Sequence, residues 1–195
     1  MNLNWKIFGV KYDKQEQWAF EQLSYLLFCA EFEKRIGIFR YKNQIGLETE
    51  PIEKDGRHYG FQAKYFSSSI NKDDITASIQ KAKRENPHLD EVYLYTNQEL
   101  SESSTQGQKK PQYQLDIENE ASALGIVIQW RVPSHMELQL SRPENKYIYD
   151  MFFSLDVSEC NLIDDVLEHN NRILQTIQTE IRFGDKVIKV DRNPI

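Results

Sequence analysis

Glu48 and the triplet Gln62-Ala63-Lys64 are residues whose types and spacing could do chemistry. Alternate residues of a strand face the same way, so Gln62 and Lys64 are expected to project together. Carboxylate and amide oxygens suit Mg²⁺ or Mn²⁺, and the backbone carbonyl of Ala63 is a further candidate ligand. A lysine beside such a cation helps to orient or deprotonate a water, or stabilises charge on a phosphoryl transition state.

A β-hairpin is predicted to bring these residues together. Residues 45–52 and 59–66 both have strand character, and an Asp-Gly turn signal lies between them in the segment 54–57. Pairing of the two arms would place Glu48 close to Gln62. Glu50 lies on the same strand face as Glu48 and is a second candidate ligand.

The rest of the first 150 residues predicts an α/β fold. Apolar residues at helical spacing predict helices over residues 15–31, 74–85 and 113–124, the last ended by Gly125. Short strands are expected over residues 37–41, 91–96 and 126–132. This order favours a mixed sheet flanked by helices, as in restriction endonucleases.

Residues 151–195 differ from this pattern and are expected to form a C-terminal appendage. A long helical pattern covers Asn161 to Ile181, and a Gly-Asp turn then leads into a short strand. The helix is expected either to pack on the core, which is the commoner behaviour of amphipathic helices, or to pair subunits. The appendage is predicted to lead into a further domain of a longer protein.

The composition excludes several classes of protein. The 195 residues carry 24 basic and 30 acidic side chains, a net charge of −6, which argues against coating nucleic acid through bulk positive charge. No apolar run is long enough to span a membrane, and the first residues do not read as a signal peptide. Two cysteines cannot form a disulfide framework, so a reducing cytoplasm is expected.

Three segments together resemble the PD-(D/E)xK nuclease superfamily: Phe20-Glu21, Gly46-Leu47-Glu48 and residues 61–65, FQAKY. The closest variant is the Mrr-like branch, in which a glutamine replaces the second acid and the motif reads QxK. The wider sequence of residues 15–131 is similar to that of nuclease domains at the amino end of bacterial antiviral STAND ATPases. This chain carries a glutamate at position 48 where an aspartate is usual, and a glutamate reaches farther.

The resemblance implies a Mg²⁺- or Mn²⁺-dependent DNA endonuclease that acts as the effector of an antiphage defence protein. Its catalytic residues would be Glu21, Glu48, Gln62 and Lys64. Double-stranded DNA, ATPase and sensor domains, and further copies of the chain are the expected partners. No P-loop motif occurs in this sequence, so the ATPase would lie outside it.

Other interpretations stay open at this point. A catalytically inactive nuclease fold used for binding or assembly, or a member that cleaves RNA, fits the same residues. The histidines are scattered and share no metal-ligand spacing. Basic residues on the second predicted helix and after the polar loop are weak candidates for contacts with a DNA backbone; they are Lys81, Lys83, Arg84, Lys109 and Lys110.

Overall fold

The computed structural model describes residues 3–40, 46–103, 109–154, 180–183 and 186–189. The chain divides into two compact units, residues 1–154 and residues 155–195. In the described part of the chain, no helix is both long and apolar enough to cross a membrane. The candidate residues singled out above all belong to the first unit.

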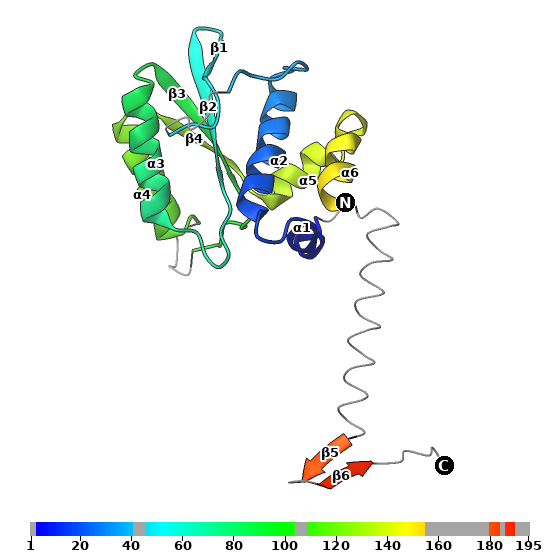
Figure 1. Ribbon diagram of the computed structural model, residues 1–195. Coiled ribbons are helices and arrows are strands. Elements are labelled where there is room, and N and C mark those ends of the chain that lie inside the picture. Colours follow the sequence, from blue (N-terminus) through cyan, green and yellow to red (C-terminus); the bar gives the residue numbers. More distant parts are fainter. Residues whose placement is uncertain (1–2, 41–45, 104–108, 155–179, 184–185, 190–195) are drawn as a thin grey trace. The chain divides into compact units, whose positions relative to one another are not determined.

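A four-stranded sheet forms the centre of the first unit (Figure 1). Its strands, in spatial order, are β1 (Ile52–Lys54), β2 (Arg57–Lys64), β3 (Leu89–Thr96) and β4 (Val127–Arg131). β1 pairs antiparallel with β2, whereas β2, β3 and β4 run parallel. The predicted α/β class with a mixed sheet flanked by helices is therefore confirmed.

Helices cover both faces of this sheet (Figure 1). They are α1 (Trp5–Lys11), α2 (Glu16–Glu31), α3 (Lys72–Glu85), α4 (Gln112–Ala123), α5 (Pro133–Leu140) and α6 (Lys146–Phe153), with a short 3₁₀ turn at Pro143–Asn145. The long crossover connections β2–α3–β3 and β3–α4–β4 each return the chain to a parallel strand, as parallel pairing requires.

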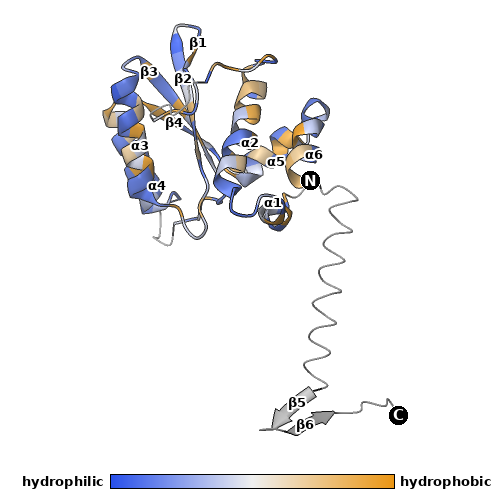
Figure 2. Ribbon diagram, in the orientation of Figure 1, coloured by the Kyte–Doolittle hydropathy of each residue, from blue (hydrophilic) through white to orange (hydrophobic). Residues whose placement is uncertain are grey.

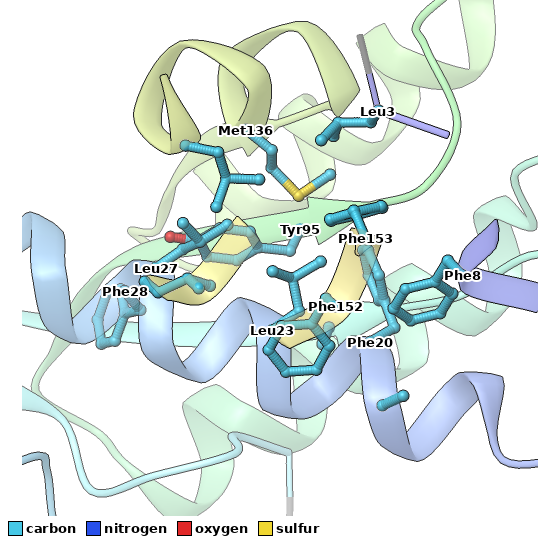
Figure 3. Packing of buried hydrophobic residues seen from close by; sticks show 14 of the residues in the cluster. Leu3, Phe8, Phe20, Leu23, Leu27, Phe28, Tyr95, Met136, Phe152 and Phe153 are labelled. Carbon is cyan, nitrogen blue, oxygen red and sulfur yellow. The ribbon is translucent and has the colours of Figure 1, made fainter. Parts of the chain in front are cut away.

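Two hydrophobic cores lie on the two faces of the sheet. One joins α2 to the aromatic side chains of α1 and α6, and Figure 3 shows Phe8, Phe20, Phe152 and Phe153 gathered around Leu23. The other packs the narrow apolar stripes of α3 and α4 onto β3 and β4, and the outer surfaces of these two helices are largely hydrophilic (Figure 2). α2 and β2 are thus fixed against each other by buried aromatic packing.

The predicted hairpin is present, with Ile52 opposite Tyr59 and the turn at Asp55-Gly56, but its first arm is shorter than predicted. Residues 46–51 run beside β2 without forming a regular strand. Two residues explain this difference. Gly46 has a positive φ of +79°, which leaves the extended region, and Pro51 lacks the N–H that a ladder needs.

Other elements differ from the sequence-based expectation. Residues 37–40 form no strand, and α3 begins at Lys72 with Asn71 as its cap, earlier than predicted. The short helices α1, α5 and α6 were not expected. The structure places Gly125 at the end of α4, with the positive φ of +71° that the C-cap prediction requires.

The second unit contains a two-stranded antiparallel sheet of β5 (Glu180–Phe183) and β6 (Lys186–Lys189). The strand after the Gly-Asp turn is therefore confirmed. The helix predicted over residues 161–181 lies outside the described residues for most of its length. Its last two residues, Glu180 and Ile181, belong to β5, so the helical prediction is wrong there because the strand pairing with β6 extends to them.

Candidate active site

Gln62 is a buried polar residue in the middle of the sheet. It lies on β2, opposite Leu94 of β3, and only 1% of it is exposed. Its Nε2 donates a hydrogen bond to the carbonyl of Gly46, but its Oε1 is buried without a hydrogen-bond partner among the described residues. An unsatisfied buried acceptor costs about 1–3 kcal/mol, so this oxygen is a position where a donor or a cation would be stabilising.

Glu48 is held against β2 by the backbone on either side of Gln62. Its own N–H donates to the carbonyl of Phe61 at 3.2 Å, and its carboxylate accepts a hydrogen bond from the backbone N–H of Ala63. The N–H and C=O of one strand residue point to the same side, so the carbonyl of Ala63 also faces the segment that contains Glu48. Two of the three predicted cation ligands, the Glu48 carboxylate and the Ala63 carbonyl, therefore lie on one side of β2.

The environment of Glu48 favours its protonated form. Burial raises the pKa of the Glu48 carboxyl, and the nearby Glu21 carboxylate raises it further, to about 7. The N–H of Ala63 and the cations Lys64 and Arg40 act in the opposite direction but do not cancel these effects. Two carboxylates from α2 and from the segment before β1 thus share a partly buried space, which a divalent cation would neutralise.

Glu21 is positioned by α2, as the predicted helix requires, and its partner is Arg40. The Arg40 guanidinium forms an ion pair with Glu21, donates to Oε1 of Gln22 at 3.1 Å and lies 4.8 Å from the centre of the Tyr25 ring. Sequence reasoning missed Arg40. The available signal was an arginine within the otherwise apolar segment GIFRY.

Lys64 is the last residue of β2, and its side chain is only 20% exposed. Its Nζ lies 3.1 Å from Oδ2 of Asp74, in the first turn of α3. The charge of Lys64 also lowers the pKa of Glu48, so the ammonium acts on the Glu48 carboxylate while it pairs with a carboxylate of α3. Sequence reasoning considered Asp74 only as a helix cap, a role that Asn71 fills.

The structure thus brings Glu21, Glu48, Gln62 and Lys64 into one region, but it does not add Glu50. Glu50 is exposed, its N–H donates to the carbonyl of Phe39 at 3.3 Å, and it is not among the charges that act on Glu48. Within the described ranges, no three His, Cys, Asp or Glu side chains gather as metal ligands. The donor set here is instead carboxylate, amide and main-chain oxygen, which is chemistry that suits Mg²⁺.

Three of the five basic residues proposed as DNA contacts are paired with other groups of the protein. Lys83 donates to the carbonyl of Leu89 at 2.8 Å, Arg84 pairs with Glu85 at 3.3 Å and Lys110 pairs with Glu118 at 2.5 Å. Lys81 on α3 and Lys109 before α4 are exposed. These contacts do not gather the five residues into one basic groove.

Two of the histidines are closer together than the sequence suggested. The rings of His58 and His88 lie 5.8 Å apart, and Nδ1 of His58 is 3.7 Å from Oδ2 of Asp90. His88 is exposed and His58 is partly exposed, as expected of surface residues. His58 is the second residue of β2 and His88 directly precedes β3. His58 lies about 20 Å along β2 from Lys64, so the two histidines take no part in the candidate site.

No protein-family model matches this sequence, and a comparison with curated proteins gives no match.

Proposed function

We propose that this chain is a divalent-metal-dependent nuclease domain that hydrolyses phosphodiester bonds in DNA. The observation that carries the proposal is the buried Oε1 of Gln62, which has no hydrogen-bond partner in the described part of the chain. Gln62 lies two residues before Lys64 on β2 and beside the segment that contains Glu48. The resemblance of these residues to the QxK variant of the PD-(D/E)xK superfamily supports the same conclusion.

The residues present fit a magnesium ion. Glu48, Oε1 of Gln62 and the carbonyl of Ala63 would hold it, and Glu21 adds a second negative charge nearby. A bound Mg²⁺ would supply positive charge to neutralise the phosphate and to polarise it toward attack. Soaking crystals with Mn²⁺ is expected to place an anomalous peak about 2.0–2.6 Å from the Glu48 carboxylate. A well-occupied ion bound elsewhere, with Glu48 facing solvent, would contradict this assignment.

Two further residues contribute charge and position. Lys64 has an ammonium paired with Asp74 whose charge also acts on Glu48, and there it can stabilise negative charge that develops on the phosphoryl oxygens. Arg40 holds Glu21 in one orientation through its ion pair. Glu48 must be ionised to bind a cation, and its raised pKa of about 7 predicts that cation binding strengthens as the pH rises through neutrality.

Cleavage of supercoiled plasmid DNA, a linear duplex, a single strand and an RNA of the same sequence tests this function. We expect Mg²⁺ or Mn²⁺ to support cleavage of DNA, and EDTA to abolish it. Cleavage of the RNA alone would reassign the substrate. Absence of cleavage of every polymer, with Mn²⁺ bound at Glu48, would favour the inactive nuclease-fold module.

The cellular role follows from the resemblance alone and is proposed on that basis. We propose a cytoplasmic effector in antiphage defence, joined to ATPase and sensor domains in a longer protein and active as a homo-oligomer. Unrestrained cleavage would damage the host genome, so such a domain is expected to be weakly active until it is assembled.

A further inference from the structure

Trp18 on α2 is an exposed aromatic side chain close to the candidate active site. It is 56% exposed, although the other two tryptophans pack inside the fold. Trp5 contacts Phe8, Phe20 and Phe153, and Trp130 is buried with its Nε1 donating to Glu118 at 3.1 Å. Among the described residues, Trp18 makes no ring contact of this kind.

Trp18 belongs to a row of residues on α2 that leads into the site. Glu21 and Gln22 lie three and four residues after Trp18, and Tyr25 lies four and three residues after them, so these residues share one side of the helix. Arg40 contacts the last three of them. Trp18 therefore extends, by one helical turn, the same surface that carries the Glu21 carboxylate.

A shallow open depression of about 650 Å³ lies at this end of α2 and is lined by Lys14, Gln15, Glu16, Gln17, Trp18 and Glu21. Glu21 belongs both to this lining and to the candidate site, where its carboxylate acts on that of Glu48. Tyr65, which directly follows Lys64, packs on α2 with its ring centre 5.7 Å from that of Phe20. The end of β2 that bears the proposed catalytic lysine therefore packs against α2, the helix that carries the depression.

We propose that Trp18 stacks on an unpaired nucleobase of the substrate, next to the phosphate that Lys64 and a cation bound at Glu48 would hold. This inference rests on the proposed nuclease function and assigns a further contact to it. The depression carries one lysine against two glutamates, which disfavours a phosphate there but is compatible with an uncharged planar base. An exposed indole is the side chain best suited to such stacking.

The stacking requires a base that has left the double helix. A single strand, a frayed end or a base displaced from a duplex satisfies this condition, whereas a fully paired duplex offers its bases only at its ends. Trp18 would therefore make the site prefer unpaired strands, or force local unpairing before a duplex is bound.

Binding without cleavage tests the inference. A labelled single-stranded oligodeoxynucleotide and a closed hairpin duplex are titrated in EDTA, with fluorescence anisotropy and tryptophan emission as readouts. We expect the single strand to quench the emission of the wild type but not that of Trp18→Phe. Trp18→Ala is expected to weaken single-strand binding by about 5- to 100-fold, with a smaller effect on the duplex stem.

Tyr147→Ala is the matched control, because Tyr147 is equally exposed, at 56%, but lines a different pocket near the other end of α2. It should leave binding unchanged, and Trp18→Phe should retain most of the affinity. Absence of binding, absence of quenching, or an equal loss in Trp18→Ala and Tyr147→Ala would overturn the inference. An equal loss of affinity for the single strand and for the duplex would overturn the inference that the stacked base is unpaired. These results are independent of cleavage, which tests the proposed function itself.

Discussion

The carboxylate of Glu48 is partly buried, lies near the Glu21 carboxylate and has a pKa raised from 4.5 to about 7. Folding must therefore place a group that prefers to be neutral at a position where binding of a cation needs its charge. Native proteins accept such costs where a site must be ready for its ligand. Glu48 is therefore expected to reduce stability at alkaline pH in the metal-free protein.

Glu48→Gln is predicted to stabilise the metal-free chain at high pH. Between pH 4.5 and about 7 the folded wild type keeps a proton on Glu48 that the unfolded chain has lost, so wild-type stability falls as the pH rises through this window. Glutamine is neutral throughout. We expect a gain of about 2 kcal/mol in the free energy of unfolding at about pH 8, shrinking toward zero below about pH 5.

Urea unfolding in EDTA at several pH values measures this difference. Glu50→Gln is the matched control, because Glu50 is exposed and lies two residues away, and it should change stability little at any pH. A difference between Glu48→Gln and wild type that does not vary with pH would contradict the raised pKa.

Individual residues also show how much of the candidate site could be predicted from the sequence. The sequence alone singled out Glu21, Glu48, Gln62 and Lys64, because a metal site restricts the residue types that can form it, and their catalytic roles stay a prediction. Arg40 and Asp74, which pair with Glu21 and Lys64, were not, because their roles come from contacts between elements distant in sequence. Glu50 was a second candidate, behind Glu48, because a regular strand was assumed there.

At the scale of elements, the segment from Gly46 to Glu48 is fixed by close backbone packing on α3. A Cβ built on Gly46 would lie 2.5 Å from the backbone nitrogen of Ala82 and 2.9 Å from the carbonyl carbon of Lys81. The carbonyl of Gly46 accepts the hydrogen bond that orients Gln62. Glycine at this position therefore sets both the course of the chain and the direction of the amide.

Gly46→Ala is predicted to destabilise the fold by about 2–4 kcal/mol, since it adds a backbone clash to the cost of a positive φ. Gly125→Ala is the control. Its φ of +71° is similar, but no atom lies within 4 Å of the added methyl group, so about 1 kcal/mol is expected. Thermal melting measures the loss of stability in each variant. Equal losses would show that the contact with α3 does not contribute to the effect of Gly46→Ala.

The elements that the sequence predicted well are those with long periodic patterns, α2, α4 and β3. α1 was missed because its seven residues include Gly9 and its stability comes from aromatic contacts of Trp5 and Phe8 with distant parts of the chain. The first hairpin arm was predicted too long because Gly46 and Pro51 interrupt a pattern that otherwise alternates.

At the scale of the whole molecule, the residues described in the two cores of the sheet domain all precede position 155. α6 crosses the boundary expected at residue 150, and its Phe152 and Phe153 are buried in the first core. Residues 1–154 are therefore predicted to fold without the second unit. We expect a chain of these residues to melt cooperatively within a few degrees of the full chain, as calorimetry would measure.

Light scattering on the same two chains tests the predicted assembly. If the segment 161–181 pairs subunits, the full chain will be an oligomer and residues 1–154 a monomer. Loss of the second unit is then expected to lower nuclease activity. Strong cleavage by a strict monomer would contradict a requirement for assembly.

The proposed nuclease function depends most directly on Lys64, and one paired measurement of cleavage and melting tests it. Lys64→Ala is expected to slow Mg²⁺-dependent cleavage by about 100-fold or more, as loss of a preorganised charge does, and to change stability by at most about 1 kcal/mol. Lys146→Ala, which removes an ion-paired lysine on α6, should leave cleavage unchanged. Cleavage by Lys64→Ala at the wild-type rate would contradict the assignment, and early melting with unchanged specific activity would make Lys64 a structural residue.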